Sequence, residues 1–230
     1  MPIKKGNLVE QAQRQPRKLQ GPNRRDPVAS RQKILEAGMR HFARAGLDGA
    51  RVVDIIREAE FSHRMLYHYF KSKEELYEAT LEFAYQQIRD AERKLHLEKM
   101  EPVEGISLLV AFTFDYYVQH PEFMALLSQE NLNGGRYVHR SGHMGDIQKP
   151  LISSLEGLMK RGVEKGVFGR MFDPVQFYID IAGLCYFGFA NRHTLSATFD
   201  ASIGKDSYLA ERRQHVIDFT IAALTGPERK

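Results

Sequence analysis

The chain has 230 residues, with 33 Lys and Arg against 29 Asp and Glu and a formal net charge of +4. This length predicts one or two compact units, and a hydrophobic share of 43% is sufficient for a packed core. The single cysteine, Cys185, excludes a disulfide framework and a cysteine-based zinc site within one chain, and we expect neither a cofactor nor a metal.

Positive charge is concentrated near the N-terminus. Residues 1–31 contain eight basic and two acidic residues, so the rest of the chain is slightly acidic. Because Gln, Arg, Pro and Gly dominate residues 1–27, we predict a disordered basic arm there. Its charge suggests a polyanionic partner. The arm is equally consistent with a tether to nucleic acid and with a passive tail.

No segment has the pattern of a targeting or membrane-spanning sequence. Residues 1–27 lack the apolar centre of a signal peptide. The longest apolar stretch, residues 179–190, is too short to span a bilayer and contains Asp180. We therefore expect a cytoplasmic protein with no membrane partner.

The hydrophobic spacing of the remaining chain is helical, so we predict an all-α fold. We expect a small DNA-binding domain at residues 28–76 and a larger helical domain at residues 77–230. The first domain begins with a helix from Val28 to Gly46, introduced by Asp26-Pro27, and a short helix follows around residues 52–59.

The turn chemistry then predicts two more helices and their starting points. Ser62 is a suitable N-cap for a third helix that ends near Tyr69. Ser72, followed three residues later by Glu75, is a capping-box pattern for a long fourth helix. Eight or nine helices are expected in all, with a partial helix near 143–147 and the later full helices at 103–120, 121–131, 150–165, 174–192 and 206–225.

Three short helices in residues 28–70, the last two a few residues apart, indicate a helix-turn-helix whose third helix enters the major groove of DNA. Leu66 and Phe70, four residues apart, are predicted to pack inward. Arg64 suits guanine O6 and N7, and hydroxyl and imidazole groups suit phosphates or base edges. The predicted DNA-binding residues are Arg51, Ser62, His63, Arg64, Tyr67, His68, Lys71 and Lys73.

Residues 57–76, Arg-Glu-Ala-Glu-Phe-Ser-x-x-x-Leu-Tyr-His-Tyr-Phe-Lys-Ser-Lys-Glu-Glu-Leu, resemble the DNA-binding domain of TetR-family transcriptional regulators. The resemblance covers residues 30–76. It implies a homodimer that binds a palindromic double-stranded DNA operator, with repression as the usual outcome, and a small-molecule effector that releases the DNA. It also implies that Tyr67 and Lys73 contact phosphates and that His63 and Arg64 lie where the family reads bases.

Three positions depart from the pattern of this family. Glu60 stands where glycine is common, so we expect a non-glycine residue in a left-handed or strained turn. Arg64 replaces a small residue, which makes the reading helix bulkier and more basic. The usual threonine cap of the second helix is missing, and Asp48 is the expected substitute, with Arg51 free to grip a phosphate.

The second domain is rich in aromatic residues, and an apolar pocket with a few polar groups is expected there. Each candidate has surface solvation or core packing as its alternative. We favour an aromatic or acyl effector. The predicted ligand-binding residues are Phe112, Tyr116, Glu130, Asn131, Tyr178 and Tyr186.

The helices from Pro174 and Asp206 are the expected dimer interface, because the resemblance implies it and the last helix carries a strong apolar face. Packing within one subunit is the alternative reading of that face. Gly183 and Gly188 would allow a close approach of helices. The apolar residues of the last helix are Val216, Phe219, Ile221 and Leu224.

Two other classes of protein were weighed. No nucleotide-binding glycine motif, nucleophile elbow or His-Glu-x-x-His motif is present, so we expect no enzyme. His139 and His143 have metal-compatible spacing, but no third histidine or cysteine accompanies them. A nonspecific or architectural DNA-binding protein without an effector is the alternative function, because the basic arm alone would support it.

Overall fold

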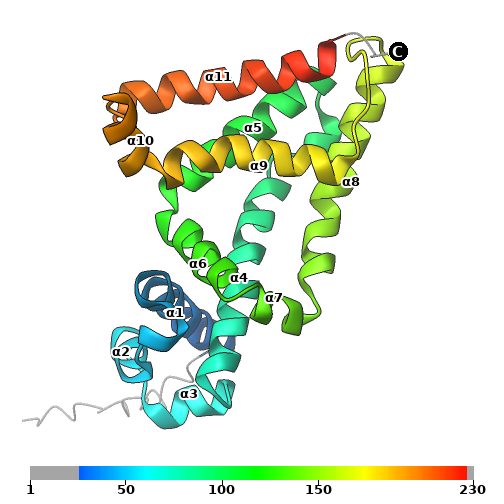
Figure 1. The fold of residues 1–230 in the computed structure, drawn as a ribbon. Helices are drawn as coiled ribbons and strands as arrows, with labels where there is room; N and C mark the ends of the chain where they lie inside the picture. Colours follow the sequence, from blue (N-terminus) through cyan, green and yellow to red (C-terminus); the bar gives the residue numbers. More distant parts are fainter. Residues whose placement is uncertain (1–25, 227–230) are drawn as a thin grey trace, which may run out of the picture.

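The structure is a computed structural model, and it describes residues 26–226. Most of the predicted basic arm, residues 1–25, lies outside the described residues. Within them the chain forms eleven α-helices and one 3₁₀-helix and no strand, so the all-α prediction is confirmed (Figure 1).

The first three helices form a small head at one end of the molecule (Figure 1): α1 (Pro27–Gly49), α2 (Val52–Glu58) and α3 (His63–Tyr69). The start of α1 is capped as predicted, because Asp26 Oδ1 accepts a hydrogen bond from the Val28 amide at 2.9 Å. Gly46 interrupts the helical backbone with a φ of 65°, a left-handed value that glycine adopts readily. The predicted end of the first helix near Gly46 is therefore close to the observed break.

The predicted caps of the next two helices are confirmed. Ser62 Oγ accepts a hydrogen bond from the Met65 amide at 3.3 Å, and Ser72 Oγ accepts one from the Glu75 amide at 3.1 Å. The Glu75 carboxylate in turn accepts from the Lys71 amide at 2.8 Å. These bonds satisfy amides that a helix start leaves unpaired. Helix α4 (Lys73–Arg93) then runs from the head into the second domain (Figure 1).

The second domain is built around α4 and α5 (Pro102–Gln119), with α9 and α11 across the end farthest from the head (Figure 1). A bidentate ion pair joins α11 to α5, with Arg213 donating to the two Asp115 oxygens at 2.8 and 2.9 Å. The remaining elements are η1 (Leu97–Lys99), α6 (Pro121–Leu132), α7 (Arg136–Ser141), α8 (Met144–Glu164), α9 (Pro174–Ala190), α10 (Arg192–Phe199) and α11 (Asp206–Thr225).

Several predicted boundaries in this domain are wrong. Pro150 lies inside α8 and does not begin it, and the partial helix expected at 143–147 is the first turn of the same element. A proline removes one backbone hydrogen bond from a helix interior, but the buried side chains of Leu151 and Leu155 continue the apolar face beyond it. Tertiary packing therefore outweighs the local preference.

The expected helix 174–192 was also too long. It ends at Ala190, where Asn191 turns the chain and its side chain donates to the Phe187 carbonyl at 3.0 Å. Helix α10 follows immediately and was not predicted. Together with α7, it makes the described number of helices larger than the eight or nine expected.

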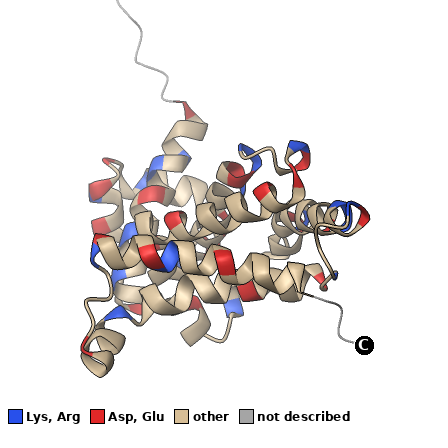
Figure 2. Cartoon of the chain, turned by 90° about the horizontal axis from the view of Figure 1, so that it is seen from above, with Lys and Arg blue, Asp and Glu red and all other residues tan. Residues whose placement is uncertain are grey.

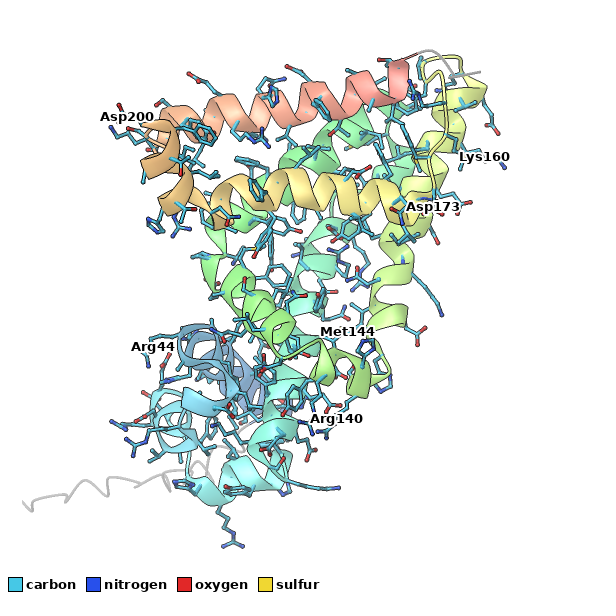
Figure 3. The ribbon with its side chains drawn as sticks, viewed as in Figure 1. Arg44, Arg140, Met144, Lys160, Asp173 and Asp200 are labelled. Carbon is cyan, nitrogen blue, oxygen red and sulfur yellow. The ribbon has the colours of Figure 1, made fainter. Side chains whose placement is uncertain are left out.

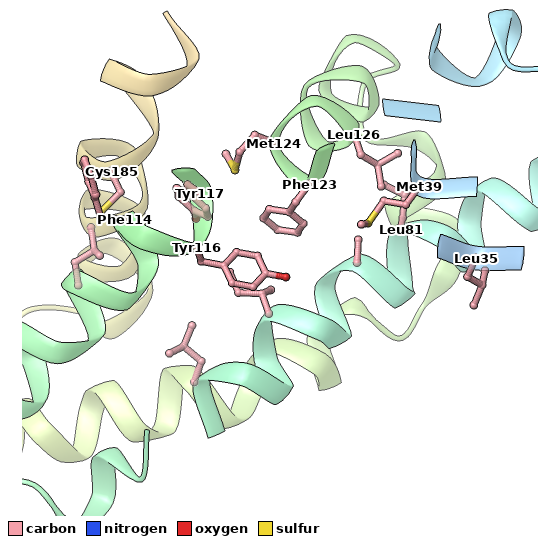
Figure 4. Packing of buried hydrophobic residues seen from close by; sticks show 14 of the residues in the cluster. Leu35, Met39, Leu81, Phe114, Tyr116, Tyr117, Phe123, Met124, Leu126 and Cys185 are labelled. Carbon is pink, nitrogen blue, oxygen red and sulfur yellow. The ribbon is translucent and has the colours of Figure 1, made fainter. Parts of the chain in front are cut away.

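The buried core is continuous from the head to the second domain. Tyr77 of α4 is fully buried, and its ring meets Phe42 of α1 at 5.0 Å and Tyr137 of α7 at 5.1 Å between centroids, edge to face in both cases. Figure 4 shows apolar side chains of α1, α4 and α6, including Met39, Leu81 and Leu126, packed close to one another. The two domains therefore share one core.

Helix α8 supplies a test of how closely its C-terminal end is packed. A Cβ atom on Gly162 would lie 1.9 Å from a ring carbon of Phe168, so Gly162→Ala forces the buried ring to move. We expect it to lower the free energy of unfolding by roughly 1–3 kcal/mol, measured by urea denaturation. Gly157→Ala on the same helix is the control, because its Cβ meets only an arginine end at 3.7 Å. Equal stability of the two variants would contradict the packing.

Candidate functional site

Helix α3 presents one buried and one exposed face at the edge of the head. Leu66 is fully buried and Phe70 nearly so, as predicted. The exposed residues of this segment are Ser62, His63, Arg64, Tyr67 and His68. Five predicted DNA-binding residues thus lie together on the solvent side of one helix.

The chemistry of this face is that of a polar reading surface. The rings of His63 and Tyr67 stack, with centroids 6.4 Å apart, which places an imidazole and a phenol one helical turn from each other. Arg64 is exposed and makes no ion pair with any residue between 26 and 226, so its guanidinium is available to a partner. A planar guanidinium in this position can meet the acceptor pair of a guanine edge.

Three more of the predicted DNA-binding residues are basic and flank α3 in the sequence, one before it and two after it. Arg51 is the N-cap of α2 and makes no side-chain cap bond; its side chain is 75% exposed. Lys71 is exposed in the turn before α4. Lys73, at the first turn of α4, donates from Nζ to the Asp48 carbonyl at 3.1 Å.

That last bond corrects one prediction. Asp48 does not cap α2 with its side chain; its backbone carbonyl receives Lys73 instead. The cap is absent because Arg51, which occupies the N-cap position, has no acceptor atom in its side chain. The Lys73 contact holds the start of α4 against the end of α1.

The turn before the reading helix adopts the predicted backbone. Glu60 has a φ of 60°, a left-handed conformation that is unfavourable for a residue with a Cβ atom. The Phe61 amide bonds to the Ile56 carbonyl at 2.9 Å and closes this turn. The helix-turn-helix geometry is therefore maintained without the glycine that is common at this position.

Helix α2 is braced against α1 by a small charged cluster. The Glu58 carboxylate accepts hydrogen bonds from Arg40 and from His41, the latter at 2.8 Å. Burial alone would raise the pKa of Glu58, but the bonds and charges of Arg40 and His41 lower it overall. This pairing fixes the position of α2, which supports α3.

A second site lies inside the second domain, around a buried ion pair on α4. Arg89 Nη1 is 2.8 Å from Glu92 Oε2, and their side chains are only 3% and 4% exposed. Arg89 Nη2 donates to the Tyr178 hydroxyl of α9 at 3.3 Å, and its guanidinium lies 5.5 Å from the centre of the Tyr178 ring. Charges so deeply buried are costly, and such groups are often functional.

This pair is incompletely hydrogen-bonded. The 2.8 Å contact is an ion pair without the angles of a hydrogen bond, so Arg89 Nε and Nη1 and both Glu92 oxygens have no hydrogen-bond partner in the described part of the chain. Burial raises the pKa of Glu92 to about 7, although the charge of Arg89 acts in the opposite direction. The carboxyl is thus partly neutral near physiological pH, while the guanidinium keeps its charge.

Phenol side chains surround the pair. Burial raises the pKa of Tyr85 to about 12 and that of Tyr116 to about 12. Tyr116 and Tyr85 both contact the ring of Phe123 edge to face, at 5.7 and 5.8 Å between centroids. Figure 4 shows Tyr116 and Phe123 facing each other between α4, α5 and α6. These phenols remain protonated and can donate hydrogen bonds.

A cavity of about 240 Å³ opens beside the ion pair, between α4, η1 and α8. Arg89 and Glu92 form its polar wall, and Arg93 and Glu98 also line it. The rest of the lining, mostly apolar, is Leu97, Pro150, Leu151 and Ser154. The space is large enough for a small organic molecule with one charged group.

The structure brings only some of the predicted ligand-binding residues to this region. Tyr178 touches Arg89, and Tyr116 interacts electrostatically with both members of the pair. Phe112 packs against Tyr116 at 5.7 Å between centroids. Tyr186 lies farther along α9, where its hydroxyl is 2.8 Å from Ser128 Oγ.

The two predicted polar residues of α6 lie elsewhere. Glu130 is buried, but its Oε1 accepts hydrogen bonds from the Tyr137 and Val138 amides at 2.7 and 3.1 Å and thereby anchors α7. Asn131 is exposed and donates to the Leu127 carbonyl at 2.9 Å. Arg140 of α7 lies beside α4 (Figure 3), with Nε 3.5 Å from Glu78.

Arg89 and Glu92 were missed by sequence reasoning, because a charged pair three residues apart is usually a solvated helix face. A signal was available. Leu81, Tyr85, Arg89 and Glu92 follow one another at helical spacing, so the charged pair continues an apolar stripe. Charges in such a stripe indicate a buried polar site.

The raised pKa of Glu92 gives a prediction for stability. Between pH 4.5 and 7 the folded protein holds a proton on Glu92 that the unfolded chain has released, so the free energy of unfolding falls as pH rises. Glu92→Gln removes this loss. Between pH 4.5 and pH 7, the free energy of unfolding of the variant should therefore rise relative to that of the wild type by up to roughly 3 kcal/mol. Denaturant unfolding at each pH measures this difference.

Glu98→Gln is the matched control, since Glu98 lines the same cavity with a side chain 60% exposed. It should follow the pH dependence of the wild type. A Glu92→Gln profile parallel to wild type across the whole interval would show that this carboxyl is not desolvated.

No helix between 26 and 226 combines the length and apolar character needed to cross a membrane. No group of three or more His, Cys, Asp or Glu side chains is arranged there to hold a metal ion.

Comparison with known proteins agrees with this architecture over both domains. Residues 34–80 match the family described as “Bacterial regulatory proteins, tetR family”, and residues 102–220 match “Tetracyclin repressor-like, C-terminal domain”. The HTH-type transcriptional repressor NicS of Pseudomonas putida is 34% identical over 195 residues, which cover 85% of this chain and 92% of that protein.

Solved structures share the fold. A putative transcriptional regulator from Saccharomonospora viridis, in complex with choline, has a TM-score of 0.67 at 19% identity and covers 88% of this chain and 100% of its own. The transcriptional regulator FadR from Bacillus subtilis, in complex with stearoyl-CoA, has a TM-score of 0.62 at 17% identity, covering 84% of this chain and 98% of its own. The chain therefore belongs to the TetR family, whose members are DNA-binding transcriptional regulators and not enzymes.

Proposed function

We propose that the protein is a transcriptional repressor that binds a palindromic operator as a homodimer and is released by a small-molecule effector. The observation that carries this proposal is the exposed polar face of α3, with Arg64 and Tyr67 one helical turn apart. The identity to NicS, a repressor, supports repression. This function places the protein in the cytoplasm, where bacterial DNA is found.

In the proposed complex, α3 lies in the major groove, which is wide enough for one helix. Arg64 donates to O6 and N7 of a guanine, and His63 contacts a neighbouring base edge. Tyr67 and Lys73 bind phosphates, since a basic side chain at a helix N-terminus adds a full charge to a position that already attracts anions. Arg51, Lys71 and His68 contribute further backbone contacts.

The proposed dimer forms through the outer faces of α9 and α11. Val175, Ile179, Gly183 and Phe187 recur every four residues on α9, and all are exposed. A Cβ atom on Gly183 would meet nothing within 4 Å, so space for a second helix is open there. Seen from above (Figure 2), positions of Lys and Arg and positions of Asp and Glu are interspersed among uncharged residues.

Only part of the predicted apolar face of α11 is free for such an interface. Val216 and Leu224 are fully buried within the subunit, and Ile221 is partly buried. Phe219 is 56% exposed, beside a hollow of about 250 Å³ between α9 and α11. The alternative reading, packing within one subunit, thus holds for Val216 and Leu224, while Phe219 remains available to a partner.

The effector is proposed to be a small, partly apolar molecule with an aromatic or acyl body, bound in the second domain. The solved neighbours in complex with stearoyl-CoA and with choline support the proposal that a protein of this fold binds a small molecule. Helix α4 connects the Arg89 region with Lys73, and the side chain of Gln129 on α6 lies against Gly46 of α1. A ligand that shifts α4 or α6 would change how the head is held.

Arg64→Ala tests sequence reading. We expect it to reduce the free energy of operator binding by roughly 1–3 kcal/mol and to relax the base preference at the base pair that Arg64 contacts. Lys73→Ala should weaken binding to all DNA sequences similarly. It should also reduce the slope of log affinity against log salt concentration by about one unit. Fluorescence anisotropy with operator and scrambled duplexes measures both. An Arg64→Ala variant that weakens the two duplexes equally would favour the nonspecific DNA-binding alternative.

Ile179→Asp tests the dimer. Ile179 is 53% exposed in the subunit, and two-fold symmetry would bring its carboxylate into the interface twice. We expect the dimer dissociation constant to rise at least about 100-fold, with loss of operator binding and an unchanged helical spectrum. Val163→Asp, at an exposed apolar position of α8, is the control. Sedimentation equilibrium decides, and a dimeric Ile179→Asp variant would rule out this interface.

A further inference from the structure

The guanidinium of Arg89 is a buried cation with unused donors. Its Nε and Nη1 make no hydrogen bond in the described part of the chain, and only Nη2 does, to Tyr178. Buried polar groups in folded proteins are nearly always hydrogen-bonded, since leaving one unpaired costs free energy. A buried guanidinium that lines a cavity and has two nitrogens without hydrogen bonds therefore identifies a position where a ligand acceptor would be stabilised.

The charge of the site is not balanced by Glu92. Burial raises the pKa of that carboxyl to about 7, while an arginine keeps its proton at all ordinary pH values. Near neutral pH the pair thus carries between zero and one positive charge. Such a site attracts an anion and disfavours a cation, because a cation would add to the buried positive charge.

The other charges at the cavity are compensated or exposed. Arg93 pairs with Asp90, and Glu98 lies 3.7 Å from His96. Helix α8 lines the cavity only with Pro150, Leu151 and Ser154. No carboxylate of α8 therefore lies in the cavity wall to compete with a ligand for Arg89. A volume of about 240 Å³ with mostly apolar walls fits a single ring or a short acyl chain.

We propose that the cavity between α4, η1 and α8 is the receptor for a small monocarboxylate, whose carboxylate binds Arg89 in place of Glu92 and whose apolar body lies against Leu97, Pro150 and Leu151. This assignment rests on the proposed function for the existence of an effector, and it adds the chemical class of that effector and its anchoring residue. The Tyr178 hydroxyl accepts a hydrogen bond from Arg89 Nη2 at 3.3 Å and holds the guanidinium in place.

The proposal is tested by calorimetric titration of the full chain, without DNA, at pH 7, where Glu92 is partly protonated and the probe acids are ionised. The probes are acetate, benzoate and hexanoate, each compared with its uncharged amide, and benzyltrimethylammonium as a cation of similar size. We expect at least one acid to bind at least about tenfold more tightly than its amide, because a charged hydrogen bond distinguishes the two.

Two variants and one control connect that preference to Arg89. Glu92→Gln removes the carboxylate that competes for the guanidinium and should bind the same acid more tightly than wild type. The double variant Arg89→Gln/Glu92→Gln replaces the ion pair with two amides and should lose the preference for the acid. Lys94→Gln removes one positive charge from an exposed position on the same stretch of chain and should behave as wild type.

Three results would overturn the assignment: no acid preferred over its amide in either wild type or Glu92→Gln, a preference that survives in the double variant, or tighter binding of the ammonium than of any acid. If the double variant does not fold, Glu92→Gln alone decides, and weaker acid binding refutes the proposal. Operator binding of each variant, measured separately without ligand, shows whether the regulator function fails independently of the carboxylate site.

Discussion

The burial of Tyr77 fixes helix α4 to the head, and the relation between the two domains depends on it. The Tyr77 ring lies between Phe42 of α1 and Tyr137 of α7, and α7 is held in turn by the Glu130 carboxylate. Burial raises the pKa of Tyr77 well above its ordinary value, and the charge of Glu130 acts in the same direction. The phenol is therefore neutral, and the head and the second domain meet in one buried, mostly apolar core.

This packing makes α4 the mechanical link between the two candidate sites. Lys73 begins the helix and Arg89 lies in its last turns, about 24 Å away along the axis at 1.5 Å per residue. A packed core resists continuous deformation, so a displacement of α4 at the cavity is passed to the head as a shift of a rigid element. A ligand acts only to the extent that it binds one arrangement of the helix more tightly than the other.

The helix caps, buried residues and turn conformation of the head could be predicted from the sequence, because they depend on residues close to one another in the chain. The caps at Ser62 and Ser72 and the buried pair of Leu66 and Phe70 follow from side-chain type and spacing, and the structure confirms them. The left-handed backbone at Glu60, also confirmed, was implied by the resemblance, in which glycine is common at this position. The second domain was less readable. Pro150 was expected to begin a helix, and the break at Asn191 was missed, because long-range packing and not local preference decides these boundaries.

The same limit applies to the regulatory site. Tyr116 and Tyr178 were expected near a ligand and do lie near Arg89, because aromatic residues mark pockets in general. Arg89 and Glu92 were not expected, since only the three-dimensional arrangement shows that α8 and α9 cover this part of α4. The apolar stripe of α4 that contains Arg89 and Glu92 indicates burial, but the local pattern does not identify the distant helices that cover these residues.

The central claim is that the exposed face of α3 reads a DNA sequence and does not merely bind the phosphate backbone. The most direct measurement is the ratio of affinities for DNA from the protein's own promoter region and for random DNA of equal length, at one fixed salt concentration. A regulator of this kind should prefer its promoter by at least about 1,000-fold. Equal affinity for the two duplexes would contradict the account.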